Sequence, residues 1–413
     1  MSITSLVRTV VLASVIMYAP VRCLCAEPAP RVPGDAVERT LTLDDCVEIA
    51  LHNSQDLLAF AEQIEYAKQR VNEARAQNFP KIDLNLNASK FANETPTILS
   101  PSFGSLYLPD AVKDFYYSTR LSLWQYLYAS GRYTTNVRLA EINLSQIKTQ
   151  SDVAHNKVIL DVKKAFYVCR ILQEKIALHR RELSSASAKK VSFRTAQSYD
   201  DALMNVRLQK SEHEYAKSCL QFLDIIGLEL DTKIALTGEL ILPDDACDLN
   251  KCMAWAFEYR PELRQTQFQE TIDSLRVNLS LTERYPTVTL GANYEWFGDN
   301  LPLNQKNWNA TINVNLPIFD GWASWYRVKQ RRNMAREAKI RRANIQDQVR
   351  LDVKQAFLDY VFWRNQARDF DNRFSLENAS DKKLARALLK LDTLEQVLDS
   401  QATLEWATGN IRK

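Results

Sequence analysis

The chain has 413 residues, 25% of them charged, with a formal net charge of +3 and only 9 Gly and 13 Pro. This composition describes a folded, helix-rich chain and excludes a disordered or collagen-like one. The charge is close to balanced and no Lys/Arg run is interleaved with aromatic residues, so no nucleic-acid partner is indicated. The basic stretch 327–342 is interpreted as the solvated face of a long helix.

The N-terminus has the organisation of a secretory signal peptide. Arg8 precedes an apolar run over 10–19, and small residues near 24–26 offer a cleavage site. About a dozen apolar residues are fewer than the roughly 20 that a membrane-spanning helix needs. Residues 1–26 are therefore predicted to be a signal peptide that directs export, and 27–40 an N-terminal linker.

The hydrophobic period changes from helical to strand-like along the chain. Residues 43–78 place apolar side chains at helical spacing, which predicts an amphipathic helix that ends before Pro80. From residue 81 the period becomes two, because Ile82, Leu84 and Leu86 alternate with Asp and Asn. The same alternation predicts four strands in two pairs, over about 81–91, 115–128, 287–297 and 309–318.

A long helical pattern without internal Gly or Pro follows each strand pair, over about 133–184 and 322–379. At 1.5 Å per residue these helices would be about 75 to 85 Å long, which is more than a globular core needs. Their apolar residues recur at three-to-four spacing, which is typical of packed helical tubes and coiled coils.

The chain also repeats itself. LDVKKAF, which begins at Leu160, returns as LDVKQAF at Leu351, and upstream Pro80 matches Pro286. A period near 200 residues is too long for a short solenoid repeat, so each copy is predicted to be half of the fold. In the repeated phrase Leu, Val, Ala and Phe are expected to face inward, and Asp and Lys outward. The predicted structural repeats are 41–240 and 241–413.

The strands have the length and alternation of membrane-spanning β-strands, with one face toward lipid and an Asn/Thr-rich face toward a wet lumen. Four strands cannot close a barrel, and unpaired backbone groups are not tolerated in hydrocarbon, so several chains must pool their strands. The alternative is a soluble pair of hairpins with an ordinary aromatic core. Aromatic residues typical of membrane interfaces accompany the strands; the candidates are Trp124, Tyr126, Trp296, Trp308 and Trp322.

LTLDDCVEIAL, the paired strands ending in LPIFDG, and the duplicated order of helix, strand pair, long helix and returning helix resemble the TolC-type outer-membrane efflux proteins. The resemblance covers about 41–413. It implies a fold that is mainly α with a small β part, in which a trimer forms a twelve-stranded β-barrel in the outer membrane and a long α-helical barrel through the periplasm of a Gram-negative-type bacterium.

The resemblance also implies a function. The chain would be the exit duct of a tripartite efflux pump or a type I secretion system, conducting substrate passively, with no enzymatic activity and no cofactor. Its implied partners are two further copies of itself, a periplasmic adaptor (membrane fusion) protein, an inner-membrane transporter and outer-membrane lipid. The sequence has no phosphate-binding Gly-rich loop, and its four His are scattered beyond metal-ligand spacing. The alternatives are a periplasmic or surface coiled-coil scaffold without a channel, and the pump's adaptor, against which the duplication speaks.

The family's helical hairpins turn back at the periplasmic tip, and the resemblance places these turns within 193–203 and 388–401. Thr195 and Lys390 replace the glycines usual there, which puts the turn shape in question because glycine permits a left-handed turn at little cost. Adaptor-docking candidates at the tip are Thr195, Ser198, Lys390 and Thr393.

Acidic positions near these turns are candidates for a periplasmic gate. Threefold symmetry would make each inward carboxylate a ring that attracts cations. A basic residue of relatives is replaced by Asp392, so like-charge repulsion is expected to loosen a closed gate. The alternative for each acid is ordinary solvated helix surface. The gate candidates are Asp201, Asp392, Gln396 and Asp399.

The predicted first hairpin gives two cysteines a structural role. If it turns near residue 194, Cys169 and Cys219 are level with each other on adjacent helices. A disulfide there would join the helices, although helix axes lie about 8–10 Å apart and bridged Cα atoms under about 7 Å. The alternative is two ordinary buried cysteines.

Overall fold

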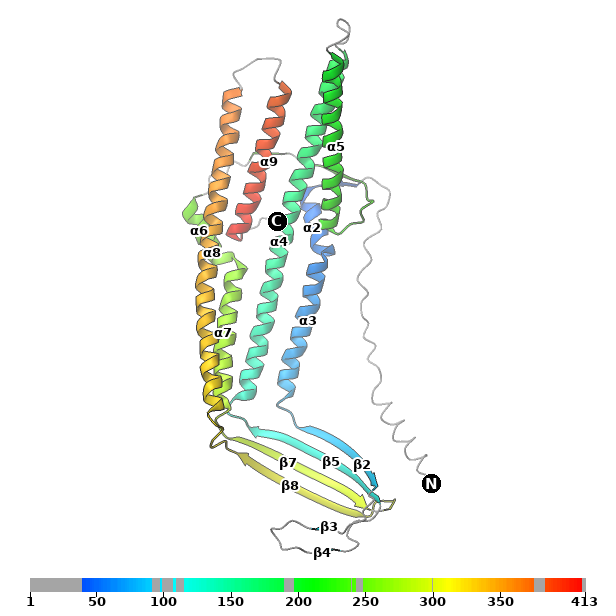
Figure 1. The fold of residues 1–413 in the computed structure, drawn as a ribbon, viewed down its shortest axis with the longest axis vertical. Coiled ribbons are helices and arrows are strands. Elements are labelled where there is room, and N and C mark those ends of the chain that lie inside the picture. Colours follow the sequence, from blue (N-terminus) through cyan, green and yellow to red (C-terminus); the bar gives the residue numbers. More distant parts are fainter. Residues whose placement is uncertain are drawn as a thin grey trace.

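The computed structural model describes residues 39–90, 97–98, 107–108, 115–188, 197–238, 240–242, 248–298, 300–374 and 383–410. The predicted signal peptide lies outside these ranges. Figure 1 shows helices standing on one four-stranded sheet, so the mainly α fold class with a small β part is confirmed. No helix within the described ranges is both long and apolar enough to cross a membrane.

Eight helices and eight strands are described. The helices are α2 (Leu43–Asn53), α3 (Gln55–Ala76), α4 (Arg132–Ala188), α5 (Gln197–Ile226), α6 (Leu249–Tyr259), α7 (Pro261–Thr282), α8 (Ala323–Phe374) and α9 (Lys383–Thr408). The main sheet consists of β2 (Lys81–Lys90), β5 (Phe115–Tyr128), β7 (Thr287–Gly298) and β8 (Gln305–Asn315). Two smaller pairs are β1 (Arg39–Leu41) with β6 (Ile234–Leu236), and β3 (Thr97–Ile98) with β4 (Tyr107–Leu108).

The strands lie close to their predicted positions. The first three agree to within one residue at each end, whereas β8 begins at Gln305 rather than 309 and ends at Asn315 rather than 318. β8 pairs with β7 from Gln305 to Asn315. The bounds of β8 are therefore set by the partner strand as well as by the alternation of its own residues, and only the alternation can be read from the sequence.

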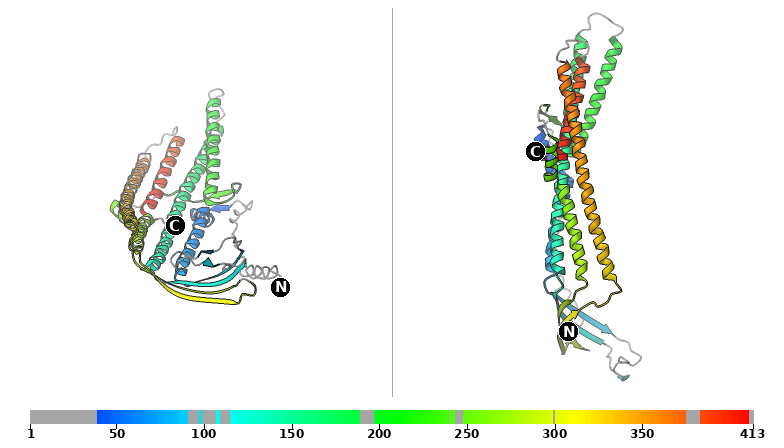
Figure 2. Two further views of the ribbon diagram at one scale, coloured as in Figure 1. Left: turned by 60° about the horizontal axis from the view of Figure 1, so that its bottom comes forward. Right: turned by 90° about the vertical axis from the view of Figure 1, so that its left-hand side faces the viewer.

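Two helices run the height of the molecule, and shorter helices pack beside them. α4 has 57 residues and α8 has 52, which at 1.5 Å per residue corresponds to about 85 and 78 Å. Near the sheet α3 and α7 flank α4, and further from it α5 and α9 take their places, while α8 packs on α7 and then on α9 (Figure 1). Figure 2 shows the curved sheet continuing from the base of this helical part.

The helix predicted over 43–78 is in fact two helices, so that prediction is wrong in one respect. Ser54 has an extended ψ of 118° and separates α2 from α3. The second copy breaks at the equivalent Arg260, whose ψ is 119°. There the cause is visible in the sequence, because Pro261 disfavours a helical conformation in the residue before it; the first copy has no such proline.

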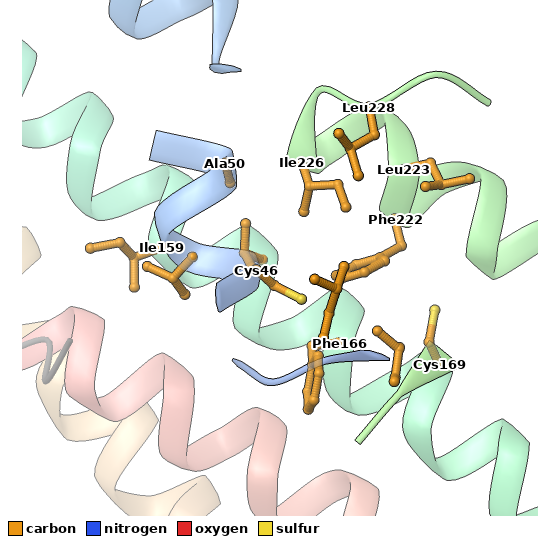
Figure 3. Close-up of a cluster of buried hydrophobic side chains, with 13 residues drawn as sticks. Cys46, Ala50, Ile159, Phe166, Cys169, Phe222, Leu223, Ile226 and Leu228 are labelled. Carbon is orange, nitrogen blue, oxygen red and sulfur yellow. The ribbon is translucent and has the colours of Figure 1, made fainter. Parts of the chain in front are cut away.

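The duplication produces two equivalent cores. The first core is formed by α2, α4 and α5 and includes the fully buried Cys46 and Val162; Figure 3 shows part of it. The second is formed by α6, α8 and α9 and includes the fully buried Cys252 and Val353. Val162 and Val353 belong to the two copies of the repeated phrase, so the phrase marks equivalent core positions as predicted. The expectation that its leucine faces inward is wrong in the second copy, where Leu351 is 48% exposed.

The polar residues of this phrase do not all face outward. Lys163 has a side chain only 10% exposed and forms an ion pair with Glu405 on α9 at 2.7 Å. In the second copy Asp352 accepts a hydrogen bond from the buried Arg260 at 3.0 Å. Each charge is compensated by a partner on another part of the chain, Glu405 on α9 and Arg260 at the break between α6 and α7, which the spacing within one helix cannot reveal.

Glycines with left-handed backbones end the returning helix in each copy. Gly227 follows α5 with φ +71°, and Gly409 follows α9 with φ +68°. A Cβ on Gly227 would lie 2.8 Å from Cβ of Asn53, and one on Gly409 would lie 3.0 Å from N of Arg260. Each glycine thus lets the end of a returning helix pack against the break between two shorter helices.

Candidate functional site

The four-stranded sheet has one continuous apolar face. Residues directly opposite one another on paired strands point to the same side. The register places Leu84, Leu121, Tyr294 and Trp308 in one row across β2, β5, β7 and β8. Leu84 is 62% exposed and Trp308 is 72% exposed, and no described helix packs over them. An uncovered apolar surface of this kind requires another partner, such as lipid.

The opposite face of the sheet is polar in its middle rows, and the aromatic residues Tyr116, Trp124 and Phe297 lie on it toward the ends. Asn85, Arg120, Glu295 and Asn307 form the next row, in which Arg120 Nη2 donates to Glu295 Oε1 at 3.0 Å. The neighbouring row on the same face, nearer the start of β2, consists of Asp83, Ser122, Asn293 and Asn309. In this row Asn293 Nδ2 donates to Asn309 Oδ1 at 3.0 Å. Side chains that pair with one another on an uncovered face are suited to water. The predicted separation of a lipid face from a wet face is therefore present.

The sheet has two strands with one neighbour each. Its order is β2-β5-β7-β8, and every pairing is antiparallel. Within the part of the chain that the structure describes, the outer sides of β2 and β8 have no strand partner. Free backbone donors and acceptors on both edges, next to an apolar face, make the isolated sheet incompatible with hydrocarbon.

The candidate interface aromatics occupy both ends of the sheet. Trp124 and Tyr126 lie near the helices with ring centroids 5.1 Å apart, and Lys81 Nζ is 5.0 Å from the centroid of Trp124. Trp322 immediately precedes α8 at the same end and is 63% exposed. Trp296 lies toward the far end of β7, and Trp308 lies on β8 opposite Tyr294. By the register, Trp296 and Trp308 lie on the apolar face, where a membrane–water interface would receive them. Trp124 and Tyr126 lie on the polar face, opposite Gly291 and Thr289, so their place at an interface stays a prediction.

A row of ion pairs joins α4 to α9 above the sheet. Three lysines of α4 face four acids of α9. The pairs, with their N–O distances, are Lys163–Glu405 (2.7 Å), Lys164–Asp399 (3.1 Å), Lys175–Asp392 (2.7 Å) and Lys175–Glu395 (3.0 Å). The gate candidates Asp392 and Asp399 therefore each form an ion pair with a lysine of α4. The sequence did not reveal these lysines, because they lie more than 200 positions from their partners.

The ion pairs correct the expectation that Asp392 loosens the structure by repulsion. Its carboxylate is compensated by Lys175, whose side chain is 17% exposed. Burial would lower the pKa of Lys175, but hydrogen bonds to Asp392 and Glu395 and the charges of both outweigh it, so this pKa lies above its ordinary value. The basic partner comes from a neighbouring helix and not from the turn.

The second turn is not where the resemblance placed it. Residues 388–401 lie inside α9, and within that helix Thr393 Oγ1 donates to the carbonyl oxygen of Lys390 at 2.9 Å. Lys390 and Thr393 are thus helical, and the chain between α8 and α9 lies over 375–382, outside the described residues. Leu, Lys, Glu and Gln dominate 388–401, and these are strong helix formers. A turn at Lys390 and Thr393 is therefore excluded, whereas adaptor docking at these residues stays a prediction.

The remaining candidates lie near the start of α5 or on the surface of α9. Ser198 and Asp201 belong to the first turns of α5, but the positions of their side chains are outside the described part, as is Thr195. Gln396 is exposed on α9 and is not among the residues of the ion-pair row. Asp201 and Gln396 therefore stay predictions.

Cys169 and Cys219 do come together on α4 and α5, but both are free thiols, so the predicted disulfide is not formed. Cys169 is fully buried, and Cys219 packs on the same core. The pKa of the Cys169 thiol is raised by the neighbouring Cys219 thiol and by burial.

Arg260 was not singled out from the sequence, and it organises the second copy. Its side chain is 4% exposed and hydrogen-bonds to Glu262 and Asp352, and its guanidinium carbon lies 4.6 Å from the ring centroid of Trp406. Arg260 thereby holds the α6–α7 break against α8 and α9. The proline after Arg260 is a sequence signal for the break, but only the structure reveals the partners of Arg260.

Comparison with known proteins gives a consistent result. The family model described as "Outer membrane efflux protein" matches residues 46–198. The protein CyaE of Bordetella pertussis is 22% identical over 346 residues, which cover 79% of this chain and 68% of CyaE.

Two solved structures show the same fold. A membrane protein from Pseudomonas aeruginosa has a TM-score of 0.71 and 14% identity, with 89% of this chain and 90% of that chain covered. The MtrE outer membrane channel of Neisseria gonorrhoeae, in its open state, has a TM-score of 0.68 and 15% identity, with 89% and 88% covered.

Proposed function

The chain belongs to the outer membrane efflux protein family and is an outer-membrane efflux channel, and on this premise we propose that three copies close one barrel of twelve strands. The observation that carries the proposal is the sheet with one uncovered apolar face, one polar face and two edges that lack a strand partner among the described residues. Lipid covers the apolar face, and neighbouring copies pair the edges.

The strand directions permit this closure. All three pairings within the sheet are antiparallel, so β8 of one copy runs antiparallel to β2 of the next. Such a join continues the pattern of the sheet without a break, as membrane barrels require. The fold shared with the family's channels favours three copies over two. A soluble scaffold would instead have to cover the apolar face, and no described element does so.

The helices extend the barrel into a duct. α4 and α8, about 85 and 78 Å long by the rise of an α-helix, carry the passage away from the membrane on the periplasmic side. We propose that the far end receives substrate from an inner-membrane transporter through a periplasmic adaptor, in a tripartite efflux pump or a type I secretion system. Ser198 and Thr195, at the first hairpin, are the proposed docking residues.

The α4–α9 ion pairs are the proposed closed-state tether of this duct. α9 begins at Lys383, and Lys164 and Lys175 hold it to α4 through Asp399, Asp392 and Glu395. Part-exposed ion pairs contribute about 1 kcal/mol or less each. A tether of that strength can be released by a partner that binds the open arrangement better.

Fractionation and conductance test the proposal. The protein expressed with its own N-terminus is expected in the outer membrane as an oligomer three times the mass of the chain, resistant to mild detergent. Inserted in a planar bilayer it should conduct with a preference for cations, and Asp399→Ala should change that preference. A water-soluble monomer without conductance would overturn the barrel. A conducting trimer whose selectivity is unchanged by Asp399→Ala would keep the duct and exclude Asp399 from the gate.

A further inference from the structure

A stretch near the start of α8 is much more basic than the equivalent part of α4. The repeated phrase relates the two helices at an offset of 191 residues, since Leu160 corresponds to Leu351. Residues 327–342 contain eight Lys or Arg and one acid, whereas the equivalent residues 136–151 contain two bases and one acid. The fold that the two copies share therefore does not account for the additional positive charge.

Aromatic side chains connect this basic stretch to the apolar face of the sheet. On β8 that face ends at Val314, which is opposite Val288 and is 62% exposed. Beyond the strand, Phe319 and Trp322 are 74% and 63% exposed, and their ring centroids are 6.2 Å apart. Trp325 follows one helical turn later, and Lys329 Nζ lies 5.2 Å from the centroid of its ring. Exposed apolar side chains thus lead directly to the first exposed base of α8.

The same side of α8 is expected to stay open when copies of the chain assemble. Near the sheet α4 packs between α3 and α7, and α8 would lie in the same way between α7 and α3 of the next copy. Three positions of α4 remain exposed although both of its neighbours are in place. At the offset of 191 they correspond to exposed positions of α8: Thr134 to Trp325, Arg138 to Lys329 and Glu141 to Arg332.

Lys329 and Arg332 are not compensated by acids of their own chain. Arg327 pairs with Glu283 at 2.7 Å, but no acid within the described ranges forms an ion pair with Lys329 or Arg332. The two bases lie about 9 and 14 Å along α8 from its first residue, Ala323. The headgroup layer beyond the hydrocarbon is about 5–8 Å thick, and long basic side chains extend toward it along a helix. Both charges can therefore reach lipid headgroups.

We propose that Lys329 and Arg332 bind the phosphate of an anionic phospholipid in the periplasmic leaflet, with Trp322 and Trp325 against its glycerol and upper acyl chains. The proposal rests on the proposed function, because it requires the apolar face of the sheet to lie in the membrane. Two cations favour a headgroup with net negative charge over a zwitterionic one, whose own ammonium they would repel. The guanidinium of Arg332 also matches phosphate oxygens with paired donors.

Native mass spectrometry of the purified oligomer in detergent tests the site, with phosphatidylglycerol and phosphatidylcholine of equal chain length as probes. Wild type is expected to bind phosphatidylglycerol in preference, at one site in each copy. A base near a membrane surface strengthens the binding of anionic lipid about fivefold, so the double variant Lys329→Gln, Arg332→Gln should bind phosphatidylglycerol at least about tenfold more weakly.

The double variant Lys339→Gln, Arg341→Gln is the matched control. It also removes one Lys and one Arg that are exposed on α8, but these lie about 24 and 27 Å from the start of the helix. Its affinity for phosphatidylglycerol should equal that of wild type. Equal losses in the two double variants, or equal binding of both lipids by wild type, would overturn the proposal.

Salt provides a measurement that needs no variant. Raising NaCl from about 0.05 to about 0.5 M should reduce the preference of wild type for phosphatidylglycerol, because salt screens the two charges. A preference that does not depend on salt would overturn the electrostatic site. A water-soluble monomer on fractionation would overturn the duct and this site together, whereas an outer-membrane trimer without lipid preference would overturn this site alone.

Discussion

Lys175 on α4 lies 2.7 Å from a carboxylate oxygen of Asp392 and 3.0 Å from one of Glu395, both on α9. One ammonium group thus compensates two acids that are three residues apart on the same helix. Removal of the base would leave these two carboxylates facing each other across one turn without a cation. The contact between α4 and α9 is therefore sensitive to this single side chain.

Lys175→Met is expected to weaken the attachment of α9 to α4 by about 1 kcal/mol, through the lost ion pairs and the acid–acid repulsion that remains. Mean conductance in a planar bilayer should rise, because the closed arrangement loses its tether. Lys210→Met is the matched control: Lys210 is 75% exposed and its partner Glu214 is 3.8 Å away on the same helix. Equal conductance in the two variants would show that the α4–α9 pairs do not restrain the duct.

Alkaline pH should abolish the contribution of Lys175 to stability. Its pKa in the folded protein lies above the ordinary value because of Asp392 and Glu395, against the effect of burial. The stabilisation is fully present below the unfolded-state pKa of Lys, about 10.4, and is lost as pH rises through the folded-state value. The Tm difference between wild type and Lys175→Met should be constant from pH 8 to 10 and shrink above it. A difference that is constant to pH 12 would contradict the assignment.

The two faces of β2 should tolerate charge differently. Leu84 and Asn85 are consecutive and both exposed, but they lie on the apolar and the polar face. An Arg on the lipid side costs up to about 2–4 kcal/mol, depending on its depth in the bilayer, and one on the lumen side costs little. Leu84→Arg should therefore reduce the amount of oligomer in the outer membrane, and Asn85→Arg should not. Western blots of membrane fractions measure both, and equal losses would refute the assignment of faces.

Gly227→Ala should be more destabilising than Gly321→Ala. Both glycines have left-handed backbones, with φ of +71° and +64°. A Cβ on Gly227 would lie 2.8 Å from Asn53, whereas one on Gly321 meets nothing within 4 Å. The second substitution costs only the backbone strain of about 1 kcal/mol, and the first adds a clash. Thermal unfolding followed by circular dichroism should give a lower Tm for Gly227→Ala, and the reverse order would be contrary to this packing.

The sequence predicted features that depend on periodicity within one element. Alternation over 81–91 predicted β2, because one face of this strand is apolar and the other is polar. The absence of internal Gly and Pro predicted the long helices α4 and α8. The phrase around Val162 and Val353 located both cores, because equivalent core positions require similar side chains.

Features that depend on contacts between elements could not be predicted. The family resemblance placed the second turn within 388–401, although that stretch is rich in helix formers and lies inside α9. Lys175 was not identified, because its partners become neighbours only when α4 packs on α9. The break at Ser54 has no proline to announce it, unlike the break before Pro261.

The interruptions in the shorter helices have a mechanical consequence. α4 and α8 are continuous from the sheet to the far end of the molecule, but α3 and α5 are separate helices on one side of α4, as are α7 and α9 on the other (Figure 1). A displacement of α5 or α9 is therefore not transmitted to the strands along an unbroken helix. α5 and α9 are thus joined to the sheet only through the packing and connections of the two long helices, so the backbone of the far end and that of the sheet are mechanically separable.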